Sequence, residues 1–173
     1  ILTAATGGEV LERRKYEKID TLVVESEYDF MRVRNAGIEE EKLRIIYPGL
    51  DLNKFSYQVP EGDFAILFAS SPFAKDYFAA RGVHLLLSAA ESCKDVHFIL
   101  TWRKWAGTVK LIKTMVKDKV NVTLNVKNLK DIRPLLNSVH AVIAPFTSYQ
   151  LNKPCPHSVI ECLAAGKPVL VSD

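Results

Sequence analysis

The sequence has no long apolar run, no paired cysteines and no large excess of charge of either sign. No stretch approaches the ~18 apolar residues that a membrane-spanning helix needs, and we expect no signal peptide. The three cysteines are odd in number and form no CxxC pair, which predicts reduced thiols and a cytoplasmic protein. A formal net charge of +3 is too small to indicate nucleic-acid binding, and we expect no nucleic-acid partner.

The composition is that of an ordinary globular protein. Of the 173 residues, 48% are hydrophobic and 25% are charged. This length allows one domain with a substantial core, or one domain and a fragment of another. The sequence starts without methionine and stops directly after a predicted strand, so we expect a piece of a longer protein.

The first third of the chain has the pattern of a small α/β segment. Its first residues are small and weakly patterned, and a Pro-Gly turn at Pro48 ends the last strand. A polar linker with Pro and Gly follows and predicts a domain boundary. The predicted elements are a loop at 1–8, helices at 9–19 and 27–37, strands at 21–26 and 43–47, and the linker at 56–63.

After the linker, strands and helices alternate regularly. This alternation predicts an α/β fold with a doubly wound, Rossmann-like parallel sheet. Pro134 indicates that the fourth helix begins just before it, or that 129–132 form a separate turn. The predicted strands are 64–70, 96–102, 120–126, 140–146 and 169–171, and the helices before the final one are 82–93, 108–118 and 129–138.

The last twenty-one residues, KPCPHSVIECLAAGKPVLVSD, carry the strongest pattern. Ser158 or His157 can open a helix that places Ile160, Leu163 and Ala164 on one apolar face, and Gly166 can end it. The apolar residues 169–171 then predict a strand covered on both faces.

The same helix carries the first candidate binding site. A helix N-terminus at the carboxyl ends of parallel strands is suited to phosphate. Glu161, one turn into the helix, could accept hydrogen bonds from sugar hydroxyls beside that phosphate.

The run SVIECLAAGKPVLVSD resembles the donor-binding helix of the retaining GT-B glycosyltransferases (group 1, or family 4-like). In that family two glutamates with seven residues between them precede a Gly-Lys-Pro-Val run. Glu161 matches the second glutamate, and the resemblance implies that it holds the ribose of a nucleotide sugar. It further implies diphosphate contacts from Ser158 and from the backbone N–H groups of 158–160, which include Val159.

A second resemblance covers 24–55, where the order of elements and the turn at Gly49 and Asp51 are similar to the family's inter-domain passage. The alternative is a generic αβ hairpin with a Pro-Gly turn. The resemblance implies that residues 1–57 are the end of an acceptor-side domain and the passage. Residues 58–173 would then be a donor-binding domain truncated at its C-terminus.

Arg81 and Gly82 resemble the family's Lys-Gly at the start of the first donor-domain helix, where the base pairs with the diphosphate. An arginine fits this role because its planar fork meets two phosphate oxygens. The alternative is a solvated side chain. The family usually has Gly-Arg at the end of the first strand, whereas this chain has Ser70 and Ser71, and Lys75 is a candidate for the missing charge.

Trp102, Arg103, Lys104 and Trp105 stand where the family often has a Gly-rich turn. Aromatic rings and cations at a strand end could stack on a base or sugar, with Arg103 near the phosphates. Equally, Trp102 could be a core residue and Trp105 a lid on the following helix.

Lys153 stands where the family has its first glutamate. A lysine cannot accept hydrogen bonds from sugar hydroxyls, but it could neutralise phosphate charge, so it stays a candidate binding residue. Three interpretations are open: this branch handles its donor differently, Gln150 or Asn152 fills the position, or activity has been lost.

The other titratable residues give weaker signals. His84, His97 and His140 are expected to be packing or surface residues. Cys155, His157 and Cys162 could be imagined around a metal, but no fourth ligand has suitable spacing, so we expect no metal.

The resemblance implies that the intact protein transfers a sugar from a nucleotide diphosphate sugar to an acceptor hydroxyl, without a cofactor or bound metal. The acceptor, a sugar or lipid-linked molecule, would bind the missing domain, and peripheral membrane association of the full-length protein is compatible with this function. The catalytic residues stay unknown, and we expect the fragment alone to be inactive. The alternatives are a GT-B-fold sugar-nucleotide epimerase and a non-catalytic nucleotide- or partner-binding domain.

Overall fold

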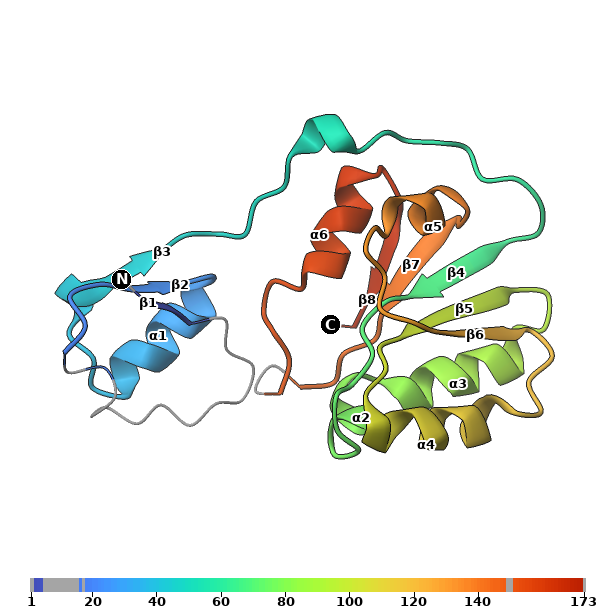
Figure 1. Ribbon diagram of the computed structural model, residues 1–173, viewed down its shortest axis with the longest axis horizontal. Coiled ribbons are helices and arrows are strands. Elements are labelled where there is room, and N and C mark those ends of the chain that lie inside the picture. Colours follow the sequence, from blue (N-terminus) through green and yellow to red (C-terminus); the bar gives the residue numbers. More distant parts are fainter. Residues whose placement is uncertain (1, 5–15, 17, 149–150, 173) are drawn as a thin grey trace. The chain divides into compact units, whose positions relative to one another are not determined.

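The computed structural model describes residues 2–4, 16, 18–148 and 151–172. The chain divides into two compact units. The N-terminal unit comprises residues 1–49 and 149–157, and the C-terminal unit comprises residues 50–148 and 158–173. Each unit contains its own parallel sheet (Figure 1).

The N-terminal unit is a three-stranded sheet with one described α-helix. Strands pair in the order β1-β2-β3, all parallel. Ser26 caps the helix, since its Oγ accepts from the Asp29 N–H at 3.0 Å. The elements are β1 (Leu2–Ala4), β2 (Leu22–Val24), α1 (Glu27–Asn35), a 3-10 turn (Glu40–Lys42) and β3 (Leu43–Ile45).

This unit departs from the sequence-based expectations in two places. Leu2–Ala4 forms a strand where we expected a loop, because parallel pairing with β2 supplies the order that the local pattern lacks. We expected Phe30, Met31 and Val33 to be buried in this helix, but Met31 is 44% exposed, and Val33 carries the core contact of α1. Most of the helix predicted at 9–19 lies outside the described residues.

The C-terminal unit confirms the predicted doubly wound parallel sheet. Its five strands pair in the order β6-β5-β4-β7-β8, every pair parallel, with β4 at the centre. The strands are β4 (Ala65–Phe68), β5 (His97–Trp102), β6 (Val122–Val126), β7 (Ala141–Ala144) and β8 (Val169–Val171).

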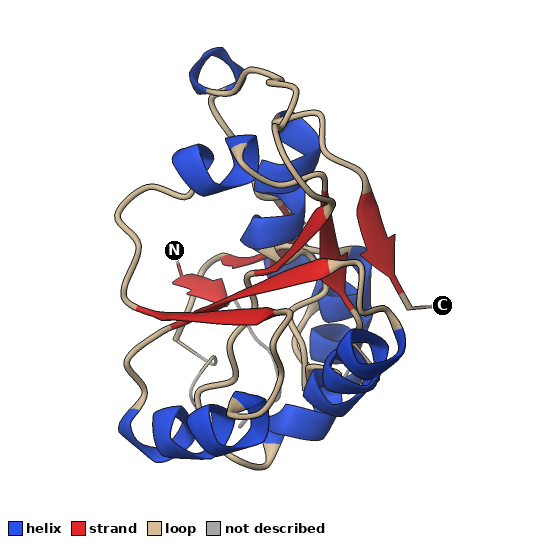
Figure 2. Cartoon of the chain, turned by 90° about the vertical axis from the view of Figure 1, so that its right-hand side faces the viewer, coloured by secondary structure: helices blue, strands red, loops and turns tan. Residues whose placement is uncertain are grey.

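Helices cover both faces of this sheet (Figures 1 and 2). Side chains alternate along β4, so Phe68 packs into the core beneath α3 and α4 while Leu67 packs into the core beneath α5 and α6. The helices are α2 (Tyr77–Ala80), α3 (Val83–Ser92), α4 (Ala106–Val116), α5 (Arg133–Asn137) and α6 (His157–Ala164).

Several local predictions are corrected. The four-residue helix α2 lies in a segment predicted as loop. On α6 the buried side chain is Cys162, and Ala165 is buried just beyond the helix, whereas Leu163 is 61% exposed. Strand β8 is the last of the described sheet and pairs only with β7 there, so Val171 is exposed instead of covered on both faces. The prediction that a helix begins just before Pro134 is confirmed by α5.

The segment leading into β4 is held against the C-terminal unit. Lys167, on the turn between α6 and β8, is only 2% exposed, and its Nζ donates to the Gln58 carbonyl at 2.8 Å. The same ammonium lies 5.1 Å from the centroid of the Tyr57 ring. Arg133 donates to the Lys54 carbonyl at 3.1 Å. Residues 54–58 therefore belong to this unit by direct contacts.

Candidate functional site

The strand order locates the candidate site. From the central strand β4, the chain adds β5 and β6 on one side and then β7 and β8 on the other. The order therefore reverses between β4 and β7. In open parallel sheets, ligands bind outside the carboxyl ends of the strands at such a reversal.

Two serines directly after β4 connect its carboxyl end to both sides of the sheet. The Ser70 Oγ lies 3.1 Å from the Ser158 Oγ in the first turn of α6. The Ser71 Oγ accepts a hydrogen bond of 3.2 Å from the backbone N–H of Arg103, which follows β5. The start of α6 is thus held at the strand end where the order reverses.

The start of α3 approaches the same place from the other helical layer. Gly82 precedes α3 with φ +65°, and a Cβ there would lie 1.7 Å from the carbonyl oxygen of Pro145, just after β7. Thr147 strengthens this approach, because its backbone N–H donates to the Ala80 carbonyl at 3.0 Å. Only glycine combines this backbone conformation with this close contact.

Arg81 lies at this junction without a carboxylate partner among the described residues. Its guanidinium carbon is 5.2 Å from the centroid of the Phe146 ring, and its Nε is buried without a hydrogen-bond partner among the described residues. Burial lowers the pKa of Arg81, the nearby Tyr77 opposes this, and the charge of Arg103 lowers the pKa further. Within the described residues, neither arginine forms an ion pair with a carboxylate.

Helix α6 begins at His157, one of the two starts that the sequence allowed, and brings three candidate residues together. Ser158 and Val159 lie in its first turn, and the half-buried Glu161 follows one turn later on the side of Ser158. Cys162 points into the core, where burial and then the Glu161 charge raise the pKa of its thiol to about 12. The thiol donates to the Ser158 carbonyl at 2.6 Å and is a structural group.

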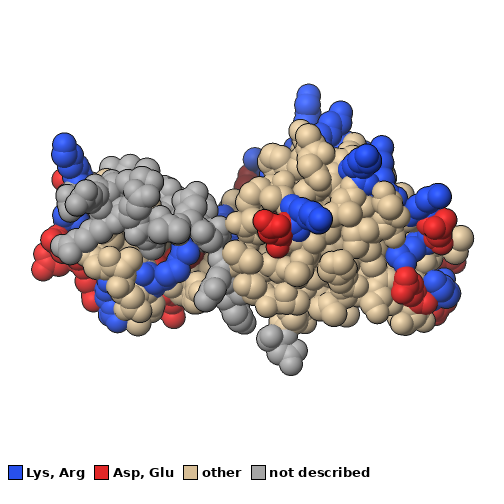
Figure 3. Space-filling view, turned by 90° about the horizontal axis from the view of Figure 1, so that it is seen from below, with Lys and Arg blue, Asp and Glu red and all other residues tan. Residues whose placement is uncertain are grey.

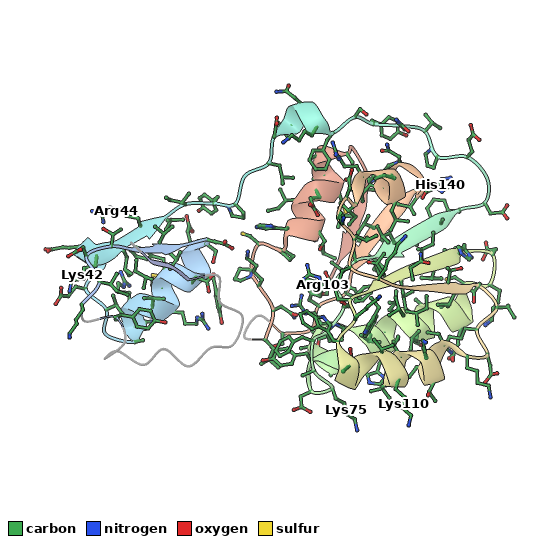
Figure 4. All side chains as sticks on the ribbon, in the orientation of Figure 1. Lys42, Arg44, Lys75, Arg103, Lys110 and His140 are labelled. Atoms are coloured by element: carbon green, nitrogen blue, oxygen red, sulfur yellow. The ribbon has the colours of Figure 1, made fainter. Side chains whose placement is uncertain are left out.

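The residues after β5 divide into core and surface. Trp102 is fully buried, and its Nε1 donates to the Thr108 Oγ at 2.9 Å, so the core alternative is confirmed for this side chain. Trp105 is 38% exposed, directly before α4. Figure 4 shows Arg103 beside the strand ends, whereas Lys75 lies on the outer side of α2, away from them.

Lys153 belongs to the N-terminal unit and has a carboxylate partner there. Its ammonium forms an ion pair with Glu25, directly after β2, and lies 3.4 Å from the His157 Nε2. Only 23% of the Lys153 side chain and 14% of the Glu25 side chain are exposed. Of the polar alternatives nearby, Asn152 is buried, and Gln150 lies outside the described residues.

Among the described residues, no cluster of three or more His, Cys, Asp and Glu side chains could hold a metal ion. Cys155, His157 and Cys162 therefore do not form the metal site that their spacing allowed us to consider. No described helix is both long and apolar enough to cross a membrane. On the face of the C-terminal unit shown in Figure 3, cationic and anionic side chains are mixed around a largely uncharged middle, so this face has no continuous basic surface.

Three contacts of these residues were not predicted from the sequence. They are the Ser70–Ser158 contact, the position of Phe146 beneath Arg81, and the Glu25 partner of Lys153. All three involve a residue in the last two positions of a predicted strand, which is the signal that could have indicated them. The pairing itself depends on which strands become neighbours, and no local pattern contains that information.

Comparison with known proteins finds similarity in structure only. No protein-family model matches the chain, and no curated protein matches its sequence. HepE from Anabaena, solved with UDP and glucose, aligns with a TM-score of 0.73 and 20% identity over 88% of this chain and 44% of HepE. The chain has the fold of the GT-B glycosyltransferases.

Two further structures with the GT-B fold agree. TarM aligns with a TM-score of 0.70 and 18% identity over 91% of this chain and 30% of TarM. WaaG, a glycosyltransferase involved in lipopolysaccharide biosynthesis, aligns with a TM-score of 0.65 and 16% identity over 87% of this chain and 44% of WaaG. The chain thus spans less than half the length of each of these proteins.

Proposed function

We propose that residues 58–173 are the nucleotide-sugar donor-binding domain of a retaining GT-B glycosyltransferase. Residues 1–57 would be the end of its acceptor-side domain and the inter-domain passage. The intact protein would transfer a sugar from a nucleotide diphosphate sugar to an acceptor hydroxyl. The acceptor would be a sugar or a lipid-linked molecule, and the protein would be cytoplasmic and compatible with peripheral membrane association.

The observation that carries this proposal is the convergence at the carboxyl end of β4. The first turn of α6 meets Ser70 there, and Arg81 lies over Phe146 on the neighbouring strand end. A helix N-terminus and a partly desolvated guanidinium that has no ion-pair partner among the described residues together suit a diphosphate. Glu161, one turn along α6, is proposed to hold the ribose hydroxyls.

The proposed mechanism is electrostatic. As the glycosidic bond to the diphosphate breaks, negative charge grows on the leaving phosphate oxygen. The Arg81 guanidinium and the backbone N–H groups of Ser158 and Val159 would stabilise that charge, since they are positioned before the reaction begins. The chain spans less than half the length of the structures it resembles, so we expect it to bind a donor without turning it over.

Calorimetric titration of the 173-residue chain with UDP, GDP and ADP tests the proposal. UDP is the first candidate because HepE and the pneumococcal transferase GtfA were solved with UDP. We expect one nucleotide to bind, with binding weakened by both Arg81→Ala and Glu161→Ala. Absence of binding at millimolar concentration, in this chain and in its full-length parent, would contradict the proposal. Sugar transfer by the chain alone would contradict the expected lack of turnover.

A second candidate is a non-catalytic nucleotide-binding domain, and the pairing of Lys153 with Glu25 favours it. A lysine already neutralised by a carboxylate contributes little positive charge to a departing phosphate. Nucleotide binding without transfer by the full-length parent, over a range of nucleotide sugars and acceptors, would support this second candidate.

A further inference from the structure

Arginines 81 and 103 stand on opposite sides of the end of β4. Arg103 follows β5, the neighbour of β4 on one side, and Arg81 packs over Phe146, which follows β7 on the other side. Neighbouring strands are about 5 Å apart, so the ends of β5 and β7, which flank β4, are about 10 Å apart. Figure 4 shows Arg103 at these strand ends.

The backbone of Arg103 is held in place. Its N–H donates to the Ser71 Oγ at 3.2 Å, which connects the residue to the end of β4. The next N–H, that of Lys104, approaches the Asn128 Oδ1 at 3.4 Å beyond β6. The backbone position from which the Arg103 side chain extends is therefore fixed beside Ser71.

Two neighbouring cations without a carboxylate between them repel each other, and burial makes the repulsion stronger. Burial is the main cause of the lowered pKa of Arg81, and the Arg103 charge lowers it further. Elsewhere in the described structure, cations such as Lys153 and Arg133 meet carboxylates. A bound anion would remove the repulsion between the two arginines and give the buried Arg81 Nε an acceptor.

We propose that Arg103 is the second cation of the diphosphate site and acts with Arg81 from the opposite side of β4, with Ser71 as its positioning residue. This inference rests on the proposed function and specifies how the diphosphate is held. The resembling family usually has an arginine directly after the first strand, where this chain has serine. The charge would here come from the next strand instead, and Lys75 would take no part.

Titration of the chain with UDP, UMP and inorganic pyrophosphate tests the inference in Arg103→Ala, Arg103→Lys and Ser71→Ala. We expect Arg103→Ala to weaken UDP and pyrophosphate about tenfold and UMP clearly less, because one phosphate cannot span both arginines. Arg103→Lys should restore part of the loss, since charge is kept and the fork is lost. Ser71→Ala should weaken UDP in the same direction by a smaller factor.

Lys110→Ala is the matched control, because it removes one positive charge from an exposed position on α4 that points away from the strand ends (Figure 4). Thermal unfolding of each variant verifies that the fold is kept. If Arg103→Ala binds UDP as Lys110→Ala does while Arg81→Ala is weakened, the inference is wrong and the proposed function stands. If the wild-type chain and its full-length parent bind no diphosphate, both are wrong.

Discussion

Arg81 and Lys153 are two cations that the sequence analysis names as candidates for binding phosphate, and the structure gives them different surroundings. Lys153 meets the Glu25 carboxylate inside the N-terminal unit. Arg81 lies over an aromatic ring in the C-terminal unit, and its Nε has no hydrogen-bond partner among the described residues. A cation that already pairs with a carboxylate has less charge available for a ligand. A partly buried cation without such a partner is stabilised when an anion binds. We therefore expect Arg81, and not Lys153, to be available to bind phosphate.

The largest expected effect is on stability and concerns Gly82, the residue directly after Arg81. Gly82→Ala forces a Cβ to 1.7 Å from the Pro145 carbonyl oxygen in a left-handed backbone conformation. We expect a loss of more than about 3 kcal/mol in the free energy of unfolding, measured by urea denaturation.

Gly62→Ala is the control for this substitution. Gly62 has a similar φ of +81°, but no atom lies within 4 Å of the position that an added Cβ would take, so we expect a loss of about 1 kcal/mol. Equal losses for the two variants would show that the contact with Pro145 does not matter.

The second prediction compares the two cations directly. Arg81→Ala should weaken UDP about tenfold or more, whereas Lys153→Ala should change the affinity less than about twofold because Glu25 already neutralises Lys153. Calorimetry at two salt concentrations checks this, since loss of a phosphate contact also reduces the salt dependence of binding. A larger effect from Lys153→Ala would reverse the comparison.

The third prediction uses a Glu161 variant to distinguish a contact with the ribose from a contact with the phosphates. Glu161→Gln keeps the size of the side chain but replaces one acceptor oxygen by a donor, so we expect UDP to weaken about fivefold. Inorganic pyrophosphate has no ribose, and its affinity should not fall. A parallel loss for both ligands would assign Glu161 to the phosphates or to the fold.

The smallest effect concerns the thiol next to Lys153. Burial, Glu25 and Asp29 raise the pKa of Cys155, and Lys153 opposes them. A raised pKa leaves less thiolate at pH 8, so Glu25→Gln should lower the pKa and make Cys155 react with a disulfide reagent about threefold faster. Cys162, with a pKa of about 12, should stay unreactive until the chain unfolds and serves as the internal control. Unchanged or slower reaction of Cys155 would show that the Glu25 charge does not raise the pKa of this thiol.

Periodicity and turn residues were sufficient to predict the parallel sheet, the start of α6 and the helix start after Arg81. These features depend on local signals such as Ser158, Gly82 and Pro134. The short helix α2 and the exposure of Leu163 were not predictable in this way, because they depend on which side of each helix faces the sheet. The Lys153–Glu25 pair joins residues far apart in the chain, so only the folded structure could show it.

Lys167 has a consequence for how the parts of a longer protein could move. Its ammonium donates to the Gln58 carbonyl and lies over the Tyr57 ring, and Arg133 donates to the Lys54 carbonyl. Residues 54–58 therefore move together with the sheet of the C-terminal unit. The chain passes from one unit to the other before this segment, between Gly49 and Leu50, and again at residues 148–149 and 157–158. A C-terminal unit expressed separately should start before Lys54, because a start at residue 58 would leave the buried Lys167 without the Tyr57 ring that covers it.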